Sequence, residues 1–212
     1  MGPLPAERLT PARVFSVCGV DYAGPLLLRI GRGRGCKTEK AWIALFICLA
    51  VKAVHLELVC GLTTEAFLAA FRRFISRRGK PVTVFSDNGS NDSNFRGGYR
   101  EMRDLKKLYD SRSHNETVAK ALAEENISWQ FSPPLGSHFG GLWEAGIKSV
   151  KHHWNRVIGN ARLTYEEMYT VLCQIEACLN SRPLCPLSTD LQVLTPGHFL
   201  ISAENLAGTR SH

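Results

Sequence analysis

Residues Pro81 to Gly89 have the sequence PVTVFSDNG, in which a short apolar run passes directly into an aspartate, Asp87. Pro81–Phe85 has the length and the continuous apolar character of a strand covered on both faces, as in a sheet flanked by helices. Asp-Asn-Gly is also a common turn sequence. The stretch therefore predicts a buried strand, a following loop and a carboxylate between them.

Upstream of this strand, the chain predicts three more strands. Val14–Tyr22 is apolar and is expected to end at Gly24-Pro25, because proline removes a ladder donor. The Gly/Arg/Lys-rich segment Arg29–Lys40 is expected to form a hairpin turn. Trp42–Ala50 is apolar, and Val51–Cys60 alternates. Short turns between these segments favour an antiparallel meander.

Helices are predicted on both sides of the Pro81–Phe85 strand. Thr63 and Thr64 can cap a helix that ends at Gly79-Lys80-Pro81, and Thr164 with Glu167 forms a capping box for the last helix. The remaining predicted elements are helices at Tyr99–Tyr109 and Glu116–Glu125, a fifth strand at Ile127–Phe131, and a long helix from Leu142.

This order of elements predicts a mixed α/β fold of the ribonuclease-H-like type. Its five-stranded sheet has three antiparallel strands and then parallel strands, with helices on both faces. We expect the domain to occupy residues 14–182, after a tether at 1–13 and before an irregular C-terminal extension at 183–212.

The composition, the net charge and the cysteine spacing limit the classes of function that the chain could have. The 212-residue chain has a net charge of +7 and a pI near 9.2, which favours a nucleic-acid partner. There is no long apolar run and no signal-peptide pattern, so we expect a soluble intracellular protein with no membrane partner. None of the seven cysteines forms a C-x-x-C pair, so neither a zinc site nor a disulfide framework is expected.

Two carboxylates are predicted at neighbouring strand ends. Asp21 closes the first strand and Asp87 follows the fourth, and these strands are adjacent in the predicted sheet. Clustered carboxylates repel one another unless a cation lies between them, and oxygen ligands suit Mg²⁺ or Mn²⁺. The structural alternative is that Asp87 belongs to a turn and that Asp21 is a cap or faces water.

Glu144 is a third candidate, at the junction between a glycine-rich loop and the long helix. Lys148 and Lys151 follow at positions i+4 and i+7 and share its helix face. One hypothesis is that Glu144 reaches metal ions while the lysines reach phosphates. The structural alternative is an exposed Glu-Lys pair on a solvated helix.

Three motifs resemble the integrase catalytic core of Bel/Pao-type LTR retrotransposons: Gly19–Pro25 (GVDYAGP), Ser86–Gly89 (SDNG) and His138–Glu144 (HFGGLWE). Leu179–Leu184 and Leu194–Leu200 are similar to that family too. The resemblance implies that the three acids, Asp21, Asp87 and Glu144, are a catalytic D-D-E triad that binds two Mg²⁺ or Mn²⁺ ions.

The resemblance also implies the reaction and the partners. The enzyme would be a polynucleotidyl transferase that trims DNA 3′ ends and joins them to target DNA, with no organic cofactor. It would work as a homo-oligomer, in the nucleus when acting on chromosomal DNA and otherwise in the cytoplasm. The residues assigned to DNA are Lys148, Lys151, Asn155, Asn88, Arg72 and Arg73.

Two departures from the family pattern keep alternatives open. Asp92-Ser93-Asn94 is interpreted as a three-residue insertion after the S-D-N-G motif, and the flanking domains usual in such integrases are not in this sequence, which suggests a fragment or a polyprotein remnant. The first alternative is a catalytically inactive nucleic-acid-binding remnant. The second is a nuclease of ribonuclease-H type, for which Asp92 is the nearby extra carboxylate.

Overall fold

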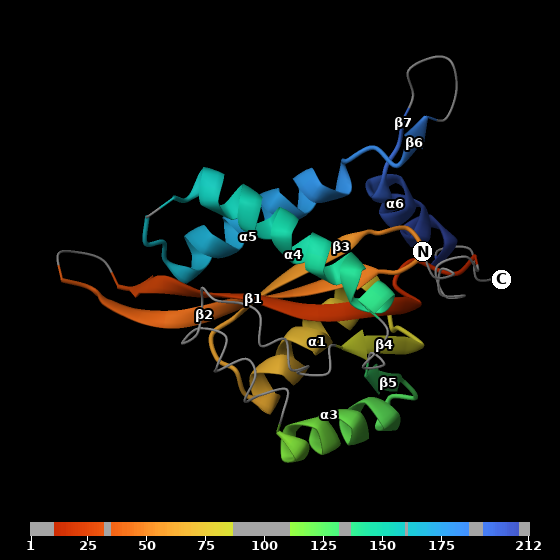
Figure 1. The fold of residues 1–212 in the computed structure, drawn as a ribbon, viewed down its shortest axis with the longest axis horizontal. Helices are drawn as coiled ribbons and strands as arrows, with labels where there is room; N and C mark the ends of the chain where they lie inside the picture. The colour runs from red at the N-terminus through yellow and green to blue at the C-terminus, as the bar shows by residue number, and fades with distance from the viewer. Residues whose placement is uncertain are drawn as a thin grey trace.

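A central sheet with strand order β3-β2-β1-β4-β5 organises the computed structural model (Figure 1). The structure describes residues 11–31, 35–86, 111–131, 137–159, 161–186 and 193–207. β1 pairs antiparallel with β2 and β2 antiparallel with β3, whereas β1 and β4, and β4 and β5, are parallel. The predicted mixed five-stranded sheet is confirmed. Its strands are β1 Val17–Ile30, β2 Lys37–Cys48, β3 Val54–Val59, β4 Thr83–Ser86 and β5 Ser128–Phe131.

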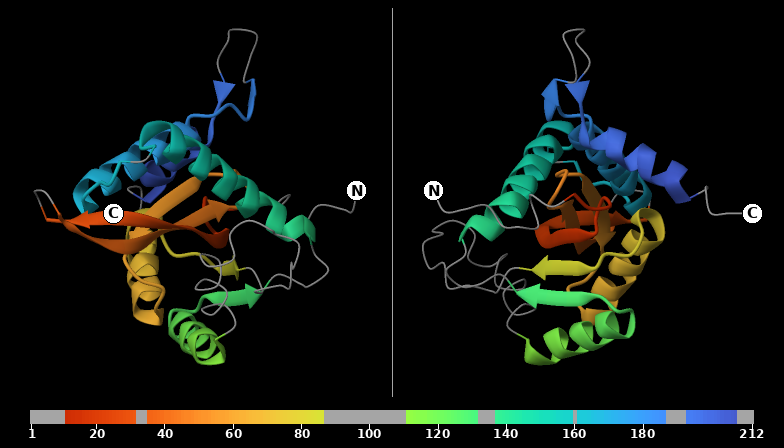
Figure 2. Two further views of the ribbon diagram at one scale, coloured as in Figure 1. Left: turned by 60° about the vertical axis from the view of Figure 1, so that its left-hand side comes forward. Right: turned by 90° about the vertical axis from the view of Figure 1, so that its right-hand side faces the viewer.

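Helices cover both faces of the sheet (Figures 1 and 2). On one face lie α1 (Thr64–Arg78) and α3 (Arg112–Glu124), and on the other α4 (Ser137–Val157) and α5 (Tyr165–Asn180). Each face buries its own apolar cluster, with Phe46, Phe71 and Phe74 among the residues on the α1 side, and Leu45, Trp143 and others on the α4 side. A strand between two such layers must be apolar on both faces, which explains why Ala41 to Cys48 of β2 are all buried.

Local capping fixes the ends of the helices as the sequence predicts. Thr63 caps α1 by accepting a hydrogen bond from the Ala66 amide, and Gly79 ends it with a φ of 80°, a conformation that favours glycine. At α5 the capping box is complete, because Thr164 and Glu167 each bond to the other's backbone amide.

The first strand is longer than predicted. β1 continues through Gly24-Pro25 to Ile30, and β2 begins at Lys37, so both ends of the expected Arg29–Lys40 loop are strand. The ladder register shifts between Ala23 and Leu26, which takes the proline out of the hydrogen-bonding pattern. Asp21 therefore lies inside β1 instead of closing it, which corrects the sequence prediction.

The C-terminal extension is not irregular throughout. It contains the short antiparallel pair β6 (Cys185–Pro186) and β7 (Val193–Leu194), followed by α6 (Pro196–Ala207). The domain boundaries themselves stay a prediction. The expected helix at 99–109 lies outside the described residues. In the described part of the chain, no helix combines the length and apolar character that crossing a bilayer requires.

Candidate active site

Asp21 projects from the face of β1 that α4 covers. Side chains two residues apart on a strand share a face, and Gly19, two residues before Asp21, lies directly against Trp143 of α4. Asp21 is half-buried, and its Oδ1 accepts a hydrogen bond from the Tyr22 amide at 2.7 Å. Its carboxylate thus stands at the interface between the sheet and α4.

Two glycines let α4 approach the sheet closely. A β-carbon on Gly19 would lie 2.3 Å from Trp143 Cε3, and one on Gly146 would lie 2.7 Å from Leu45 Cδ2. Real β-carbons do not come this near to another heavy atom, so a side chain at position 19 would require the Trp143 ring or α4 to move, whereas one at position 146 would require the end of the Leu45 side chain to shift. Trp143 is fully buried. Because Glu144 is the next residue, this packing fixes where Glu144 leaves the helix relative to Asp21.

The outer face of α4 carries the predicted polar stripe. Glu144, Lys148, Lys151 and Asn155 are all exposed. Ile147 and Val150 are buried under the helix, and Trp154 is half-buried. The lysines therefore point out of the core, as expected from the helical period. α4 also begins at Ser137, earlier than the predicted start at Leu142.

The second aspartate cannot be placed, because Asp87 and Asn88 lie outside the described residues. The parallel register pairs Gly19 with Phe85 and Val20 with Ser86, and Asp87 is the next residue in the sequence. Among the described residues, no group of three or more His, Cys, Asp and Glu side chains is arranged to hold a metal ion. The triad thus stays a prediction, with two of its members located.

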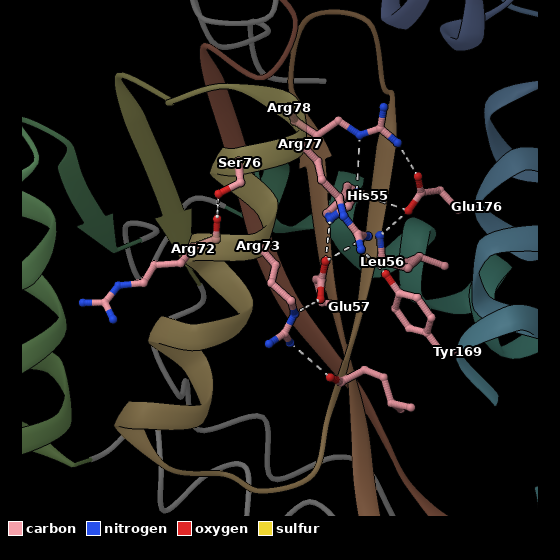
Figure 3. A network of polar contacts seen from close by, with 11 residues as sticks. His55, Leu56, Glu57, Arg72, Arg73, Ser76, Arg77, Arg78, Tyr169 and Glu176 are labelled. Atoms are coloured by element: carbon pink, nitrogen blue, oxygen red, sulfur yellow. Dashed lines mark hydrogen bonds and ion pairs between the residues drawn. The ribbon is translucent and has the colours of Figure 1, made fainter. Parts of the chain in front are cut away.

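Arg72 and Arg73 lie on α1, on the opposite face of the sheet from α4 (Figure 2). Arg72 is exposed and points away from its neighbours, whereas Arg73 turns toward β3 (Figure 3). Arg73 Nε donates to Glu57 Oε2 at 2.5 Å, and its Nη2 donates to the Leu58 carbonyl at 3.3 Å. The structure does not bring these arginines together with the α4 lysines, so they belong to a separate surface.

Sequence reasoning missed a polar network beside β3. His55 and Glu57 are almost completely buried, and they contact Glu176 of α5 and three arginines of α1 (Figure 3). The sequence did carry a sign of this network, because two ionisable residues stand inside an otherwise apolar strand. A second missed feature is Gly19, whose role only the Trp143 contact reveals.

Comparison with known proteins identifies the fold. No protein-family model matches the chain, and no curated protein matches it significantly. Among solved structures, one chain of the simian T-cell lymphotropic virus intasome in complex with the PP2A regulatory subunit B56 gamma aligns with a TM-score of 0.59 and 13% identity, covering 94% of this chain and 59% of that one.

A second structure matches over nearly its whole length. The integrase catalytic core domain of HTLV-2, in complex with magnesium and in a dimeric form, aligns with a TM-score of 0.54 and 15% identity, covering 89% of this chain and 97% of that one. The present chain thus spans about three-fifths of the intasome protein and almost the full catalytic core. The described sheet and its flanking helices therefore have the ribonuclease-H-like fold of a retroviral integrase catalytic core.

Proposed function

We propose that the chain is an integrase-type catalytic domain that transfers phosphoryl groups on DNA with divalent metal ions. The observation that carries the proposal is the packing of Trp143 of α4 against Gly19, because Trp143 is next to Glu144 in the sequence and Gly19 lies two residues from Asp21 on the same face of β1. The fold shared with retroviral integrase cores supports it. The motif resemblance extends it to a retrotransposon of Bel/Pao type, and to 3′-end processing and strand transfer in DNA integration.

The donor set fits Mg²⁺ or Mn²⁺. Asp21 and Glu144 offer carboxylate oxygens, which hard divalent cations prefer, and Glu144 is exposed to solvent. Asp87 would supply the third carboxylate. When bound, two such ions activate the attacking oxygen and stabilise the leaving one in an in-line displacement. The similar HTLV-2 core was solved with magnesium.

The exposed stripe of α4 would hold the substrate. Lys148 and Lys151 lie one and two turns beyond Glu144, so they can pair with phosphates that follow the reacting one along the strand. Asn155 would extend this track as a neutral donor. The ammonium groups orient the strand without taking part in bond making, and the proton of the attacking water or 3′ hydroxyl leaves to solvent.

On this proposal the partners are the DNA ends of the element and target DNA. The working form is a homo-oligomer, as in the dimeric integrase core it resembles. The protein would act in the nucleus, where chromosomal DNA is found, and is otherwise cytoplasmic.

The decisive experiment is strand transfer on a short labelled duplex that carries the element's terminal sequence. We expect product in Mn²⁺ or Mg²⁺ and none in EDTA, with loss of activity in Asp21→Asn and Glu144→Gln. Glu124→Gln on α3, an exposed acid on the far face, is the matched control and should react as wild type does. A folded protein that binds the duplex but forms no product in either metal would indicate the inactive remnant. Cleavage of an RNA–DNA hybrid would indicate the nuclease instead.

A further inference from the structure

β3 is an edge strand of the sheet, and side chains close its outer edge. Asn180 Oδ1 accepts from the Val54 amide at 2.8 Å, and Asn180 Nδ2 donates to the Val54 carbonyl at 2.9 Å. Two residues further along, the Leu56 amide donates to Glu176 Oε2 at 2.7 Å. The Leu58 carbonyl then accepts from Arg73 Nη2.

These contacts take the place of a neighbouring strand. Outward-facing backbone groups recur at every second residue of an edge strand, and here α5 and α1 bond to both groups at position 54, to the amide at position 56 and to the carbonyl at position 58. Edge strands with free groups recruit other strands, so these contacts oppose strand addition at β3. Two of the three positions depend on charged groups, and only position 54 is closed by a neutral amide.

His55 lies at the centre of the charged side chains that bond to the edge of β3 (Figure 3). Its ring is 1% exposed, with Nε2 3.0 Å from Glu57 Oε1 and Nδ1 3.3 Å from Glu176 Oε2. The charged groups that surround it are Glu57 of β3, Glu176 of α5, and Arg73, Arg77 and Arg78 of α1. The aromatic rings of Phe46 and Phe74 pack against the imidazole and add no titratable group.

The oxygen that faces His55 Nδ1 is the same one that holds the Leu56 amide. Glu176 Oε2 accepts from both groups, while Glu176 Oε1 pairs with Arg78 Nη2 at 2.5 Å. Only the imidazolium form has a proton on both ring nitrogens, so only that form can donate to both carboxylates. The neutral form that keeps Nε2–H on Glu57 turns an Nδ1 lone pair toward Glu176, and two lone pairs repel.

A second contact, from Arg78, can stabilise the neutral form of the His55 ring. Arg78 Nε lies 3.4 Å from His55 Nδ1, and an Nε–H group donates only to an unprotonated ring nitrogen. Loss of the Nδ1 proton therefore exchanges one partner for another, from Glu176 as acceptor to Arg78 as donor. The two arrangements share every other contact of the ring.

From this geometry we propose that His55 is a proton-operated latch on the edge of the sheet. The imidazolium holds Glu176 on the Leu56 amide and keeps the middle of β3 closed, and deprotonation at Nδ1 releases that amide. Position 54, which Asn180 holds without charge, stays closed. The proposal rests on the contacts of β3, α1 and α5 and is independent of the DNA chemistry proposed above.

The direction of the pKa shift agrees with this geometry. Burial alone would lower the pKa of His55, but the hydrogen bonds to Glu176 and Glu57 outweigh burial and raise it above the ordinary value of 6.5. The closed form is therefore the form present below pH 6.5, and the latch opens as the pH rises through the folded-state pKa of His55.

Amide hydrogen exchange on the wild-type protein tests the latch without any substitution. Protection factors of Leu56 and Val54 would be measured by NMR, corrected for intrinsic exchange, together with the His55 ring signals from about pH 6 to about pH 9. We expect the Leu56 protection factor to fall about tenfold across the titration of His55, while that of Val54 is unchanged.

A variant pair supplies the control. In His55→Gln the Leu56 protection factor should no longer depend on pH, whereas His152→Gln, which removes an exposed histidine of α4, should behave as wild type. Constant Leu56 protection in wild type would overturn the proposal, and so would a His55 ring that does not titrate in this range. Equal losses at Leu56 and Val54 would overturn it as well, because they would mean that the whole edge frays.

Discussion

Trp143 of α4 lies so close to Gly19 of β1 that no other residue type fits at position 19, since a β-carbon there would be 2.3 Å from Trp143 Cε3. This contact joins two segments separated by more than a hundred residues. Trp143 precedes Glu144, and Gly19 shares its strand face with Asp21, so one packing contact joins the two segments that carry Asp21 and Glu144, two of the three candidate metal ligands. The most direct test of the site is therefore a substitution outside it.

Gly19→Ala should destabilise the fold and displace α4. Forcing a methyl group into a packed interface costs about 1–3 kcal/mol, which urea unfolding would measure as a lower midpoint. Gly141→Ala is the matched control, because a β-carbon there meets nothing within 4 Å. In a helix that change should be neutral or stabilise by roughly 0.5–1 kcal/mol. Equal stability of the two variants would contradict the packing argument.

Divalent metal should stabilise the folded protein if the carboxylates form a site. A ligand that binds only the folded state raises the thermal midpoint, and about 2.7 kcal/mol is gained at a concentration a hundred times the Kd. We expect Mn²⁺ to raise the midpoint of wild type and of Glu124→Gln, and to have little effect on Asp21→Asn. A full response of Asp21→Asn to Mn²⁺ would remove Asp21 from the site.

Lys148 and Lys151 should contribute affinity for DNA and none for the fold. Both are exposed on α4, so Lys148→Ala with Lys151→Ala should leave the unfolding midpoint within about 0.5 kcal/mol of wild type. Each phosphate contact adds about 0.9 to the slope of log Kd against log salt, so the double variant should lose up to about two such units. Lys120→Ala on α3 is the control. An unchanged salt slope in the double variant would show that these lysines face solvent and make no contact with DNA phosphates.

Arg72 and Arg73 should separate into two different roles. Arg73 donates to the buried Glu57, and removing it leaves that carboxylate with Arg77 at 3.4 Å and His55 as partners. Arg73→Ala should therefore cost roughly 1–2 kcal/mol of stability, whereas the exposed Arg72→Ala should cost less than about 0.5 kcal/mol. Chemical denaturation and DNA titration of both variants check this. If Arg73→Ala is folded and binds DNA more weakly than wild type while Arg72→Ala does not, the predicted contact of Arg73 with DNA would be supported.

The network beside β3 should make stability depend on pH in both directions. Burial alone would lower the pKa of His55, yet its bonds to Glu176 and Glu57 raise it above 6.5. The contribution of protonated His55 to the free energy of unfolding is complete below pH 6.5 and is lost as pH rises through the folded-state pKa. For Glu57 and Glu176, burial alone would raise the pKa, but hydrogen bonds, from His55 above all, lower it below 4.5. Their contribution is complete above pH 4.5 and is lost as pH falls through the folded-state values.

The part of the free energy of unfolding that these three groups supply is therefore largest between pH 4.5 and pH 6.5. Urea unfolding across a pH series would show it. His55→Gln should remove the decline above pH 6.5 and leave a smaller decline at acid pH, because Arg73 still lowers the pKa of Glu57 and Arg78 that of Glu176. Parallel alkaline declines in wild type and variant would assign that decline to other groups.

The sequence by itself determined the features that arise from neighbouring residues. The capping box of Thr164 and Glu167, the glycine end of α1 at Gly79 and the outward direction of Lys148 and Lys151 all follow from spacings of a few residues. The order of the strands also followed, because apolar runs of strand length separated by helical periods permit few sheet topologies.

Only the tertiary structure decided what depends on contacts between distant segments. The alternation in Val51–Cys60 suggested one polar face, but all six residues of β3 are buried, because α1 and α5 bring arginines and a glutamate to His55 and Glu57. β1 passes through Gly24-Pro25 because pairing with β2 resumes at Leu26 after a register shift. In both cases the free energy comes from partners far along the chain, and no local pattern encodes where those partners will lie.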